Sequence, residues 1–374
     1  MKKKILIVFG TRPEAIKMCP VVQEINQNNE LDLCVCVTGQ HKEMLQQVLD
    51  IFEVKVDYNL HIMKDKQTLY DITYSVMEGI RKVIWNEKPD LALVHGDTAT
   101  TFATALTCFY EKVPIGHVEA GLRTYNLNSP YPEEFNRQVV DTVSELYFAP
   151  TECAKRNLLQ EGKKEENIFV TGNTAIDALR KTVKKDYCHE IIEWADDSRM
   201  ILLTAHRREN WGKPLENIFC AVKATVDKYN DVKVVYPVHK NPIIREAAYK
   251  ILGNHDRIKL TEPLNVIDFH NIIARAYLIL TDSGGIQEEA PSLGKPVLVL
   301  RDTTERPEGI EAGTLKLSGT NSDKIEKDID ILLNQPEEYE KMSKAQNPYG
   351  DGYASKRILE GIIAWGKKKD GCVI

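Results

Sequence analysis

The sequence lacks several features that would place it in other classes of protein. Basic residues gather only at Lys2–Lys4 and Lys367–Lys369, and the net charge is −6 over 374 residues. Nucleic acid is therefore not expected as a partner, because binding to a phosphate backbone requires a concentrated basic surface. No apolar run approaches the roughly 20 residues of a membrane span, so no membrane partner is expected either. A small anionic ligand, which a few arginines can bind, is compatible with this charge.

The positions of the cysteines also argue against a metal site. The eight cysteines are scattered, and no pair has the spacing of metal ligands. We interpret them as reduced thiols and expect a cytoplasmic protein without a metal cofactor. The apolar run Ile5–Phe9 after the first lysines is too short for a signal peptide. It is more typical of a buried first strand.

Short β-rich runs alternate with helical patterns along most of the chain. This alternation predicts an α/β fold with parallel sheets, and the length suits two domains. One helix is expected at Thr98–Tyr110, with Thr98 as its N-cap. The predicted strands are Ile5–Phe9, Leu31–Thr38, Leu91–His95, Pro114–Val118, Leu146–Ala149 and Ile168–Thr171, and then Met200–Thr204, Val232–Pro237, Ile258–Leu260, Tyr277–Thr281 and Pro296–Leu300.

The two series of strands predict two doubly wound domains. The polar segment Lys184–Arg199 separates them, and we place the domains at residues 1–172 and 173–353. A last amphipathic helix, within 354–374, is expected to pack back on the first domain. Ligands of open α/β sheets bind at the carboxyl ends of the strands, so we expect a site in a crevice that both domains line.

The first strand is followed by Gly10–Glu14, which opens a helix. Arg12 and Lys17 would lie near the start of that helix, where cations are slightly unfavourable unless an anion binds there. They could equally be solvated surface cations. The turn lacks the G-x-G-x-x-G spacing of a dinucleotide fold, so a nicotinamide cofactor is not expected.

Three carboxylates follow strands of the first domain. Asp97 comes after the strand Leu91–His95, Glu119 comes after Val118, and Glu133 lies in a predicted loop from Thr124 to Glu134. Such residues can simply cap helices. If they converge, their mutual repulsion should raise at least one pKa into the range that is useful for proton transfer.

Comparable features follow strands of the second domain. The segment Thr281–Glu289 places Ser283, Gly284 and Gly285 at the start of a helix, where free amides and the helix dipole favour an anion. A plain strand–helix turn remains the alternative. His206 and His239 each follow a strand and stand beside cations, which suits contact with a phosphate.

Taken in order along the chain, these segments resemble the non-hydrolysing UDP-N-acetylglucosamine 2-epimerases of bacteria. The resemblance runs from residue 4 to about residue 365, and its motifs are Phe9–Glu14, Val94–Thr98, His117–Arg123, Thr204–Glu209, Asp282–Glu289 and Arg301–Pro307. It implies a glycosyltransferase-B-like fold of two Rossmann-like domains and a homodimer. It also implies interconversion of UDP-N-acetylglucosamine and UDP-N-acetylmannosamine through elimination of UDP to 2-acetamidoglucal, without a cofactor, for cell-envelope polysaccharides.

The resemblance also assigns residues by their positions in these motifs. It implies that the catalytic residues are Asp97, Glu119, Glu133 and His206. It implies that the substrate-binding residues are Arg12, Lys17, Phe269, Ser283, Gly284, Gly285, Glu289 and Arg306. A second, regulatory UDP-N-acetylglucosamine site would include Gln40, His41, Glu43, Lys66, Arg207 and His239. Glu43 and Lys66 depart from the glutamine and arginine expected there, and lysine is a poorer bidentate anion ligand than arginine.

Other functions remain as alternatives. A hydrolysing epimerase would release free N-acetylmannosamine, and a retaining glycosyltransferase of the same fold would need an acceptor. A non-catalytic nucleotide-sugar sensor would bind without turnover. The number of carboxylates in the first domain favours epimerisation over transfer.

Overall fold

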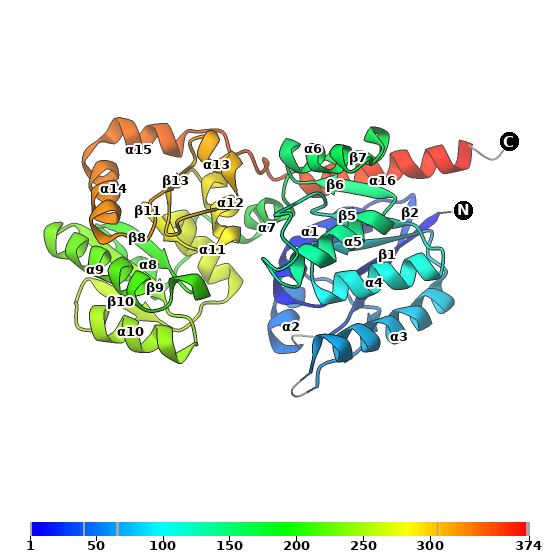
Figure 1. Cartoon of the computed structure of the whole chain (residues 1–374), viewed down its shortest axis with the longest axis horizontal. Coiled ribbons are helices and arrows are strands. Elements are labelled where there is room, and N and C mark those ends of the chain that lie inside the picture. The colour runs from blue at the N-terminus through cyan, green and yellow to red at the C-terminus, as the bar shows by residue number, and fades with distance from the viewer. Residues whose placement is uncertain (1, 40–41, 65–66, 305, 372–374) are drawn as a thin grey trace. The chain divides into compact units, whose positions relative to one another are not determined.

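The computed structural model describes residues 2–39, 42–64, 67–304 and 306–371. The chain forms two compact units, of which the first comprises Met1–Ala178 and Gly350–Ile374 and the second comprises Leu179–Tyr349. The division falls inside one helix, α7 (Thr174–Thr182), a few residues after our predicted boundary at 172. Each unit is a parallel sheet covered by helices (Figure 1). No helix among the described residues is long and apolar enough to span a membrane.

The first unit has a sheet with the order β3-β2-β1-β4-β5-β6-β7. Its strands are β1 (Lys3–Phe9), β2 (Leu31–Val37), β3 (Tyr58–Asn59), β4 (Leu91–His95), β5 (Ile115–Val118), β6 (Leu146–Ala149) and β7 (Ile168–Val170). Its helices, besides most of α7, are α1 (Arg12–Asn26), α2 (Lys42–Ile51), α3 (Leu69–Glu87), α4 (Ala99–Tyr110), α5 (Glu133–Val143), α6 (Glu152–Gln160) and α16 (Ala354–Gly371).

The second unit repeats this topology in the order β10-β9-β8-β11-β12-β13. Its strands are β8 (Arg199–Thr204), β9 (Val232–Pro237), β10 (Ile258–Thr261), β11 (Leu278–Thr281), β12 (Val297–Val299) and β13 (Leu315–Leu317). Its helices are α8 (Glu190–Ala195), α9 (Lys213–Lys228), α10 (Pro242–Leu252), α11 (Val266–Arg275), α12 (Gly284–Ser292), α13 (Pro307–Glu311), α14 (Ser322–Asn334) and α15 (Pro336–Ser343).

All strand pairs in both sheets are parallel, which confirms the predicted fold class of two doubly wound α/β units. Every predicted strand is present within one or two residues of its predicted ends. The structure adds β3 and β13, which are too short to give a hydrophobic pattern of their own. Thr98 caps α4 as predicted, because its side chain accepts from the amide of Thr101. The predicted loop Thr124–Glu134 is two positions too long, because α5 begins at Glu133.

Buried strands position the functional edge of the first unit. Residues 5–9 of β1 and 91–94 of β4 are fully buried, as parallel strands covered on both faces require. Helices α3, α4 and α5 pack side by side over one face, and α16 packs beside α1 on the other. The register pairs Phe9 with Val37 and His95 with Val118, so β1, β2, β4 and β5 end at one edge. The residues that follow these strands are therefore held close to one another.

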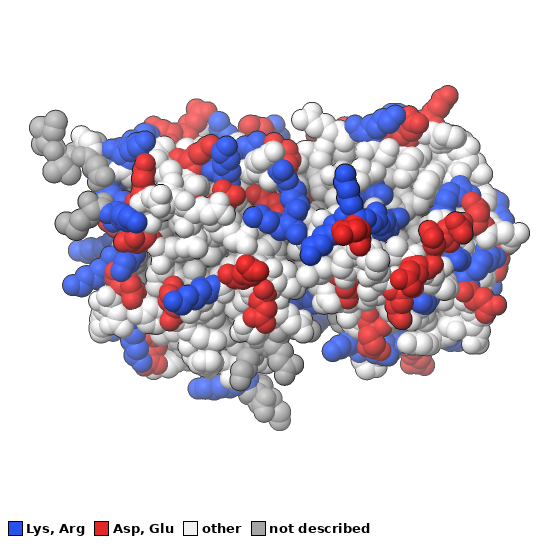
Figure 2. Space-filling view, turned by 180° about the vertical axis from the view of Figure 1, so that it is seen from behind, with Lys and Arg blue, Asp and Glu red and all other residues white. Residues whose placement is uncertain are grey.

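On the face drawn in Figure 2, acidic and basic side chains are interspersed. This mixture agrees with the near balance of 49 basic and 55 acidic residues in the sequence.

Candidate active site

Glu119 is the most constrained carboxylate at the edge of the first sheet. It follows β5 directly, with a left-handed backbone (φ 68°), and its carboxylate lies beside the Gly96 turn that precedes Asp97. Its Oε2 forms an ion pair with Lys17 of α1 and accepts from Asn173 Nδ2 at 3.3 Å. His95 Nε2 is 3.6 Å from the same oxygen. Three elements therefore contribute partners to this one carboxylate.

These partners decide the charge of Glu119. Burial alone would raise its pKa, but Lys17 and His95 outweigh that effect and hold the pKa well below the usual value for a glutamate. The expectation that at least one of the crowded carboxylates has a raised pKa is not met at Glu119, because Lys17, His95 and Asn173 face it. Glu119 is thus ionised at neutral pH and is suited to accept a proton.

Asp97 is held by α5, the helix that Glu133 begins. Arg137 forms an ion pair with the Asp97 carboxylate, and Asn136 Nδ2 donates to its backbone carbonyl at 2.8 Å. Arg137 also lies 3.3 Å from Glu134 on its own helix. The structure therefore brings Asp97 and the start of α5 together, although 36 residues separate Asp97 from Glu133 in the sequence.

A buried glutamate fixes the turn after β1. The Glu14 carboxylate accepts from the amides of Gly10 (3.0 Å) and Thr11 (2.7 Å) and from the hydroxyls of Thr98 (2.7 Å) and Thr101 (3.0 Å). The contact with the Thr11 amide and the bond from the Glu14 amide to Thr11 Oγ1 (3.4 Å) form the capping box of α1. The two hydroxyl contacts tie α1 to the start of α4. Arg12 therefore starts α1 at a fixed position near the Asp97 turn. Partial burial lowers the pKa of its guanidinium.

In the second unit, α12 starts with Ser283 as its N-cap and with two glycines. The guanidinium of Arg306 lies against Gly284, where an added Cβ would stand 2.7 to 3.0 Å from its atoms. Glu288 orients it, since Arg306 Nε donates to Glu288 Oε1 at 2.7 Å. A cation and the free amides of a helix N-terminus thus lie together, which is the arrangement that binds a phosphate.

His206 lies at the same edge, at the end of β8. Asp282, which is fully buried, accepts from the amides of His206 (2.8 Å) and Arg207 (2.9 Å) and from Asn210 Nδ2 (3.0 Å). Its other oxygen lies 3.5 Å from His206 Nδ1, and the ring stacks on His239 at a centroid distance of 5.6 Å. Burial lowers the pKa of His206, which outweighs the opposite effect of Asp282. The ring is therefore neutral at pH 7.

The remaining predicted binding residues lie close to this group. Glu289 is on α12, with its carboxylate 3.9 Å from His270 Nε2, and Phe269 is a half-buried residue of α11. Of the predicted regulatory residues, Gln40, His41, Lys66 and the side chain of Glu43 lie outside the described residues. Arg207 and His239 adjoin His206.

Sequence reasoning missed four residues of these groups: His95, Arg137, Asn173 and Asp282. His95 and Asp282 stand in the motifs Val94–Thr98 and Asp282–Glu289, but no role was predicted for either. His95 is the last residue of β4, and Asn173 follows β7, so a search of all strand ends would have found both. Arg137 lies four residues after Glu133, a spacing that places two residues of a helix on the same face.

The described residues contain no group of three or more His, Cys, Asp or Glu side chains that could hold a metal ion.

Comparison with known proteins gives a consistent result. The family model of UDP-N-acetylglucosamine 2-epimerase matches residues 23–363. The UDP-N-acetylglucosamine 2-epimerase of Bacillus subtilis is 58% identical over 97% of this chain and 96% of its own length. The structure of S. aureus MnaA with UDP has a TM-score of 0.90 and 55% identity over 98% of this chain and 97% of that one. The structure of UDP-GlcNAc 2-epimerase from Neisseria meningitidis, bound to UDP-GlcNAc, has a TM-score of 0.89 and 49% identity over 96% of this chain and 100% of that one.

Proposed function

The chain belongs to the UDP-N-acetylglucosamine 2-epimerase family, and we propose that it interconverts UDP-N-acetylglucosamine and UDP-N-acetylmannosamine by eliminating and re-adding UDP. The observation that carries this mechanism is the ionised carboxylate of Glu119, which Lys17 and His95 contact beside the Asp97 turn. An epimerase needs such a base. A module that only binds a nucleotide sugar does not.

The chemistry at C2 dictates the route. No carbonyl group is adjacent to C2 of the sugar, so direct removal and return of the C2 proton would produce an unstabilised carbanion. Loss of UDP from C1 together with the C2 proton gives 2-acetamidoglucal instead. Addition of UDP to this alkene, with a proton delivered to the other face of C2, gives the epimer.

The residues divide these tasks according to their charge. Glu119, held ionised by Lys17 and His95, is the base that accepts the C2 proton. Asp97 and Glu133 supply the other proton transfers. Ser283, Gly284, Gly285 and Arg306 hold the departing diphosphate through helix amides and a guanidinium, with Arg12 and His206 as further ligands. In this proposal, Phe269 and Glu289 contact the nucleoside of the substrate.

The activity is tested by incubating the purified chain with UDP-N-acetylglucosamine alone and following the nucleotide sugars by NMR. We expect a mixture of the two UDP-sugars at equilibrium, with no free sugar. Accumulation of free N-acetylmannosamine and UDP would establish the hydrolysing reaction instead. Absence of any change without an acceptor would favour a glycosyltransferase or a sensor.

We propose that the chain acts as a homodimer, and exposed aromatic side chains of the first unit support this. Phe109 (55% exposed) and Tyr110 (64%) end α4, and Trp85 (54%) of the neighbouring α3 donates to Glu111 at 2.8 Å. Aromatic side chains are enriched where protein surfaces associate.

Tyr110→Glu should weaken the dimer by about 30-fold in its dissociation constant, because it would place a charge within an apolar contact. Sedimentation velocity over a range of concentrations measures this change. Tyr249→Glu, at a 47% exposed tyrosine of the second unit, is the matched control and should leave the dimer intact. A wild-type monomer, or equal effects of both variants, would contradict the proposed interface.

We also propose a regulatory UDP-N-acetylglucosamine site that includes Arg207 and His239, which adjoin His206. Binding there would alter the position of the His206 ring. The initial rate with UDP-N-acetylmannosamine should therefore rise by at least about 5-fold when a little UDP-N-acetylglucosamine is added. Equal rates with and without the addition would show that the chain is not regulated in this way.

The product suits the synthesis of cell-envelope polysaccharides, and we propose this role. We also propose a cytoplasmic location, which the free thiols of the described cysteines support.

A further inference from the structure

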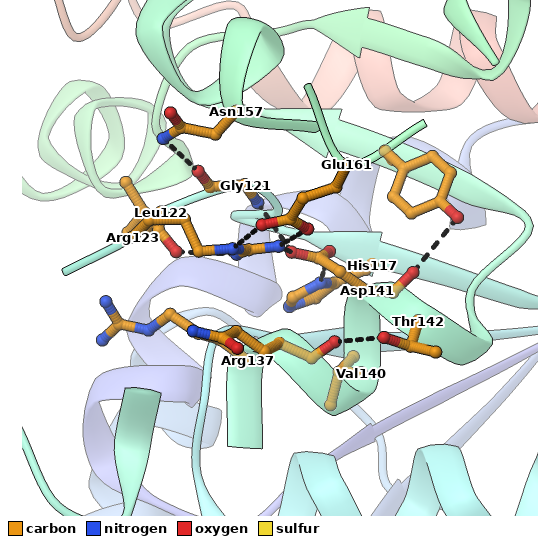
Figure 3. Close-up of polar contacts among 12 residues, drawn as sticks. His117, Gly121, Leu122, Arg123, Arg137, Val140, Asp141, Thr142, Asn157 and Glu161 are labelled. Atoms are coloured by element: carbon orange, nitrogen blue, oxygen red, sulfur yellow. Dashed lines mark hydrogen bonds and ion pairs between the residues drawn. The ribbon is translucent and has the colours of Figure 1, made fainter. Parts of the chain in front are cut away.

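A completely buried histidine lies beneath the edge that carries the proposed catalytic carboxylates. His117 is in β5, and both of its ring nitrogens contact oxygen atoms. Nδ1 lies 2.6 Å from Asp141 Oδ1 (Figure 3). Nε2 lies 2.8 Å from the carbonyl oxygen of Gly96. A neutral imidazole has one donor and one acceptor nitrogen, and a carbonyl oxygen can only accept. Nε2 therefore donates to Gly96.

Asp141 settles the role of the other ring nitrogen. Its Oδ2 accepts from the amide of Gly121 at 3.1 Å and lies 2.7 Å from Arg123 Nη2. Burial would raise the pKa of Asp141, but His117 and Arg123 hold it below its usual value, so the carboxylate is ionised. Nδ1, 2.6 Å from this carboxylate, then donates as well, so both ring nitrogens of His117 act as hydrogen-bond donors. Glu161, 2.7 Å from Arg123, adds a second carboxylate to the network.

This buried network joins the backbone segments on which the three proposed catalytic carboxylates stand. Gly96, whose carbonyl accepts from His117, directly precedes Asp97. Gly121, whose amide donates to Asp141, stands two residues after Glu119. Asp141 itself is on α5, which begins at Glu133. Glu119 has positive φ (68°), a conformation that is strained for a residue other than glycine and that the surrounding contacts must hold.

We infer that His117 and Asp141 are positioning residues for epimerisation, which fix the Asp97 turn, the Glu119 turn and α5 relative to one another. This inference rests on the proposed function of the three carboxylates. A role in stability alone explains the network less well, because a buried ion pair is often no more stabilising than an apolar pair of similar volume. A fixed, doubly donating ring instead sets the distance between a carbonyl on one strand and a carboxylate on a helix.

Two substitutions test the two hydrogen bonds of the His117 ring separately. In His117→Gln, the amide nitrogen takes the place of Nε2 and retains the donation to Gly96. In His117→Asn, the amide nitrogen takes the place of Nδ1 and retains the donation to Asp141, so that the Asp97 turn loses its support. We expect His117→Asn to lower kcat by about 100-fold, the effect of a misplacement of about 1 Å at a reacting group. His117→Gln should lower kcat by less than about 10-fold.

Three further measurements distinguish positioning from loss of structure. KM and the dissociation constant of UDP should change less than about 3-fold in both variants. The reason is that the residues of α12 that are proposed to hold the diphosphate are not part of this network. The melting temperature should fall by similar amounts in the two. Glu87→Gln is the control, since it removes a carboxylate that pairs with Lys4 (2.9 Å) near the other end of β1, and it should change stability without changing kcat.

The outcomes separate this inference from the proposed function. A wild-type chain without epimerase activity would refute the proposed function. An active wild type with equal kcat losses in both His117 variants, or with no loss in His117→Asn, would overturn the inference alone.

If the variants do not fold, the wild-type protein still tests the inference. With ¹⁵N-labelled histidine, NMR should show one of the nine imidazoles with a hydrogen-bonded proton on each ring nitrogen. Absence of such a ring would overturn the inference.

Discussion

Replacing Glu119 by glutamine should lower kcat by about 10²- to 10⁴-fold, the contribution of a positioned base. Glutamine has nearly the same shape and can still contact Lys17 and Asn173 through its amide, but it cannot accept the C2 proton. Binding of UDP should be retained, because the proposed diphosphate ligands of α12 and Arg306 are unchanged. The measurement is kcat from the rate of UDP-N-acetylmannosamine formation, together with calorimetric titration of UDP.

Glu87→Gln is a matched control for this variant. Glu87 also pairs with a lysine, Lys4, and its pKa is also lowered, chiefly by hydrogen bonds from Tyr58 and Lys4. It lies near the amino end of β1, about 16 Å from the functional edge at roughly 3.3 Å per residue. Loss of an ion pair as such should therefore leave kcat unchanged. Normal turnover by Glu119→Gln, or an equal loss in Glu87→Gln, would remove Glu119 from the mechanism.

The second large effect is expected at the start of α12. In Gly284→Ala, the new methyl group would stand 2.7 to 3.0 Å from the guanidinium of Arg306, closer than van der Waals contact permits. Arg306 must then move away from the free amides with which it is proposed to bind the diphosphate. We expect the dissociation constant of UDP and the KM of the UDP-sugar to rise by about 10- to 100-fold, the range for one charge-assisted hydrogen bond.

Gly285→Ala is the control for this second variant. A methyl group there would meet only Glu289 Oε1 at 3.7 Å, an ordinary contact, so the same substitution one residue away should bind UDP nearly as the wild type does. Isothermal titration with UDP compares the two. Equal affinities of both alanine variants would show that the contact between Gly284 and Arg306 does not serve the diphosphate.

The sequence was sufficient to predict the repeating architecture. Buried parallel strands give continuous apolar runs, and these runs located all but β3 and β13. It also located the segments after the strands, and thus Asp97, Glu119 and the glycines of α12. The sequence also predicted a helix N-cap where the residue type favours that position, as at Thr98.

Sequence reasoning could not give the partners of these residues. Lys17 and Glu119 are 102 residues apart, and nothing local in either segment predicts that they form an ion pair. Because the sequence does not show this contact, it could not show that the pKa of Glu119 is lowered. The roles of Arg137 and His117 could not be predicted for the same reason. Both roles depend on how α5 packs against β4 and β5.

The central claim is that this chain breaks and remakes the C2–H bond while UDP leaves and returns. Incubation with UDP-N-acetylglucosamine alone in heavy water tests it most directly, with the products analysed by NMR and mass spectrometry. We predict one deuterium at C2 of UDP-N-acetylmannosamine, and in time of recovered UDP-N-acetylglucosamine, with UDP still attached. UDP-sugars without deuterium, or deuterium found only in free N-acetylmannosamine, would contradict the claim.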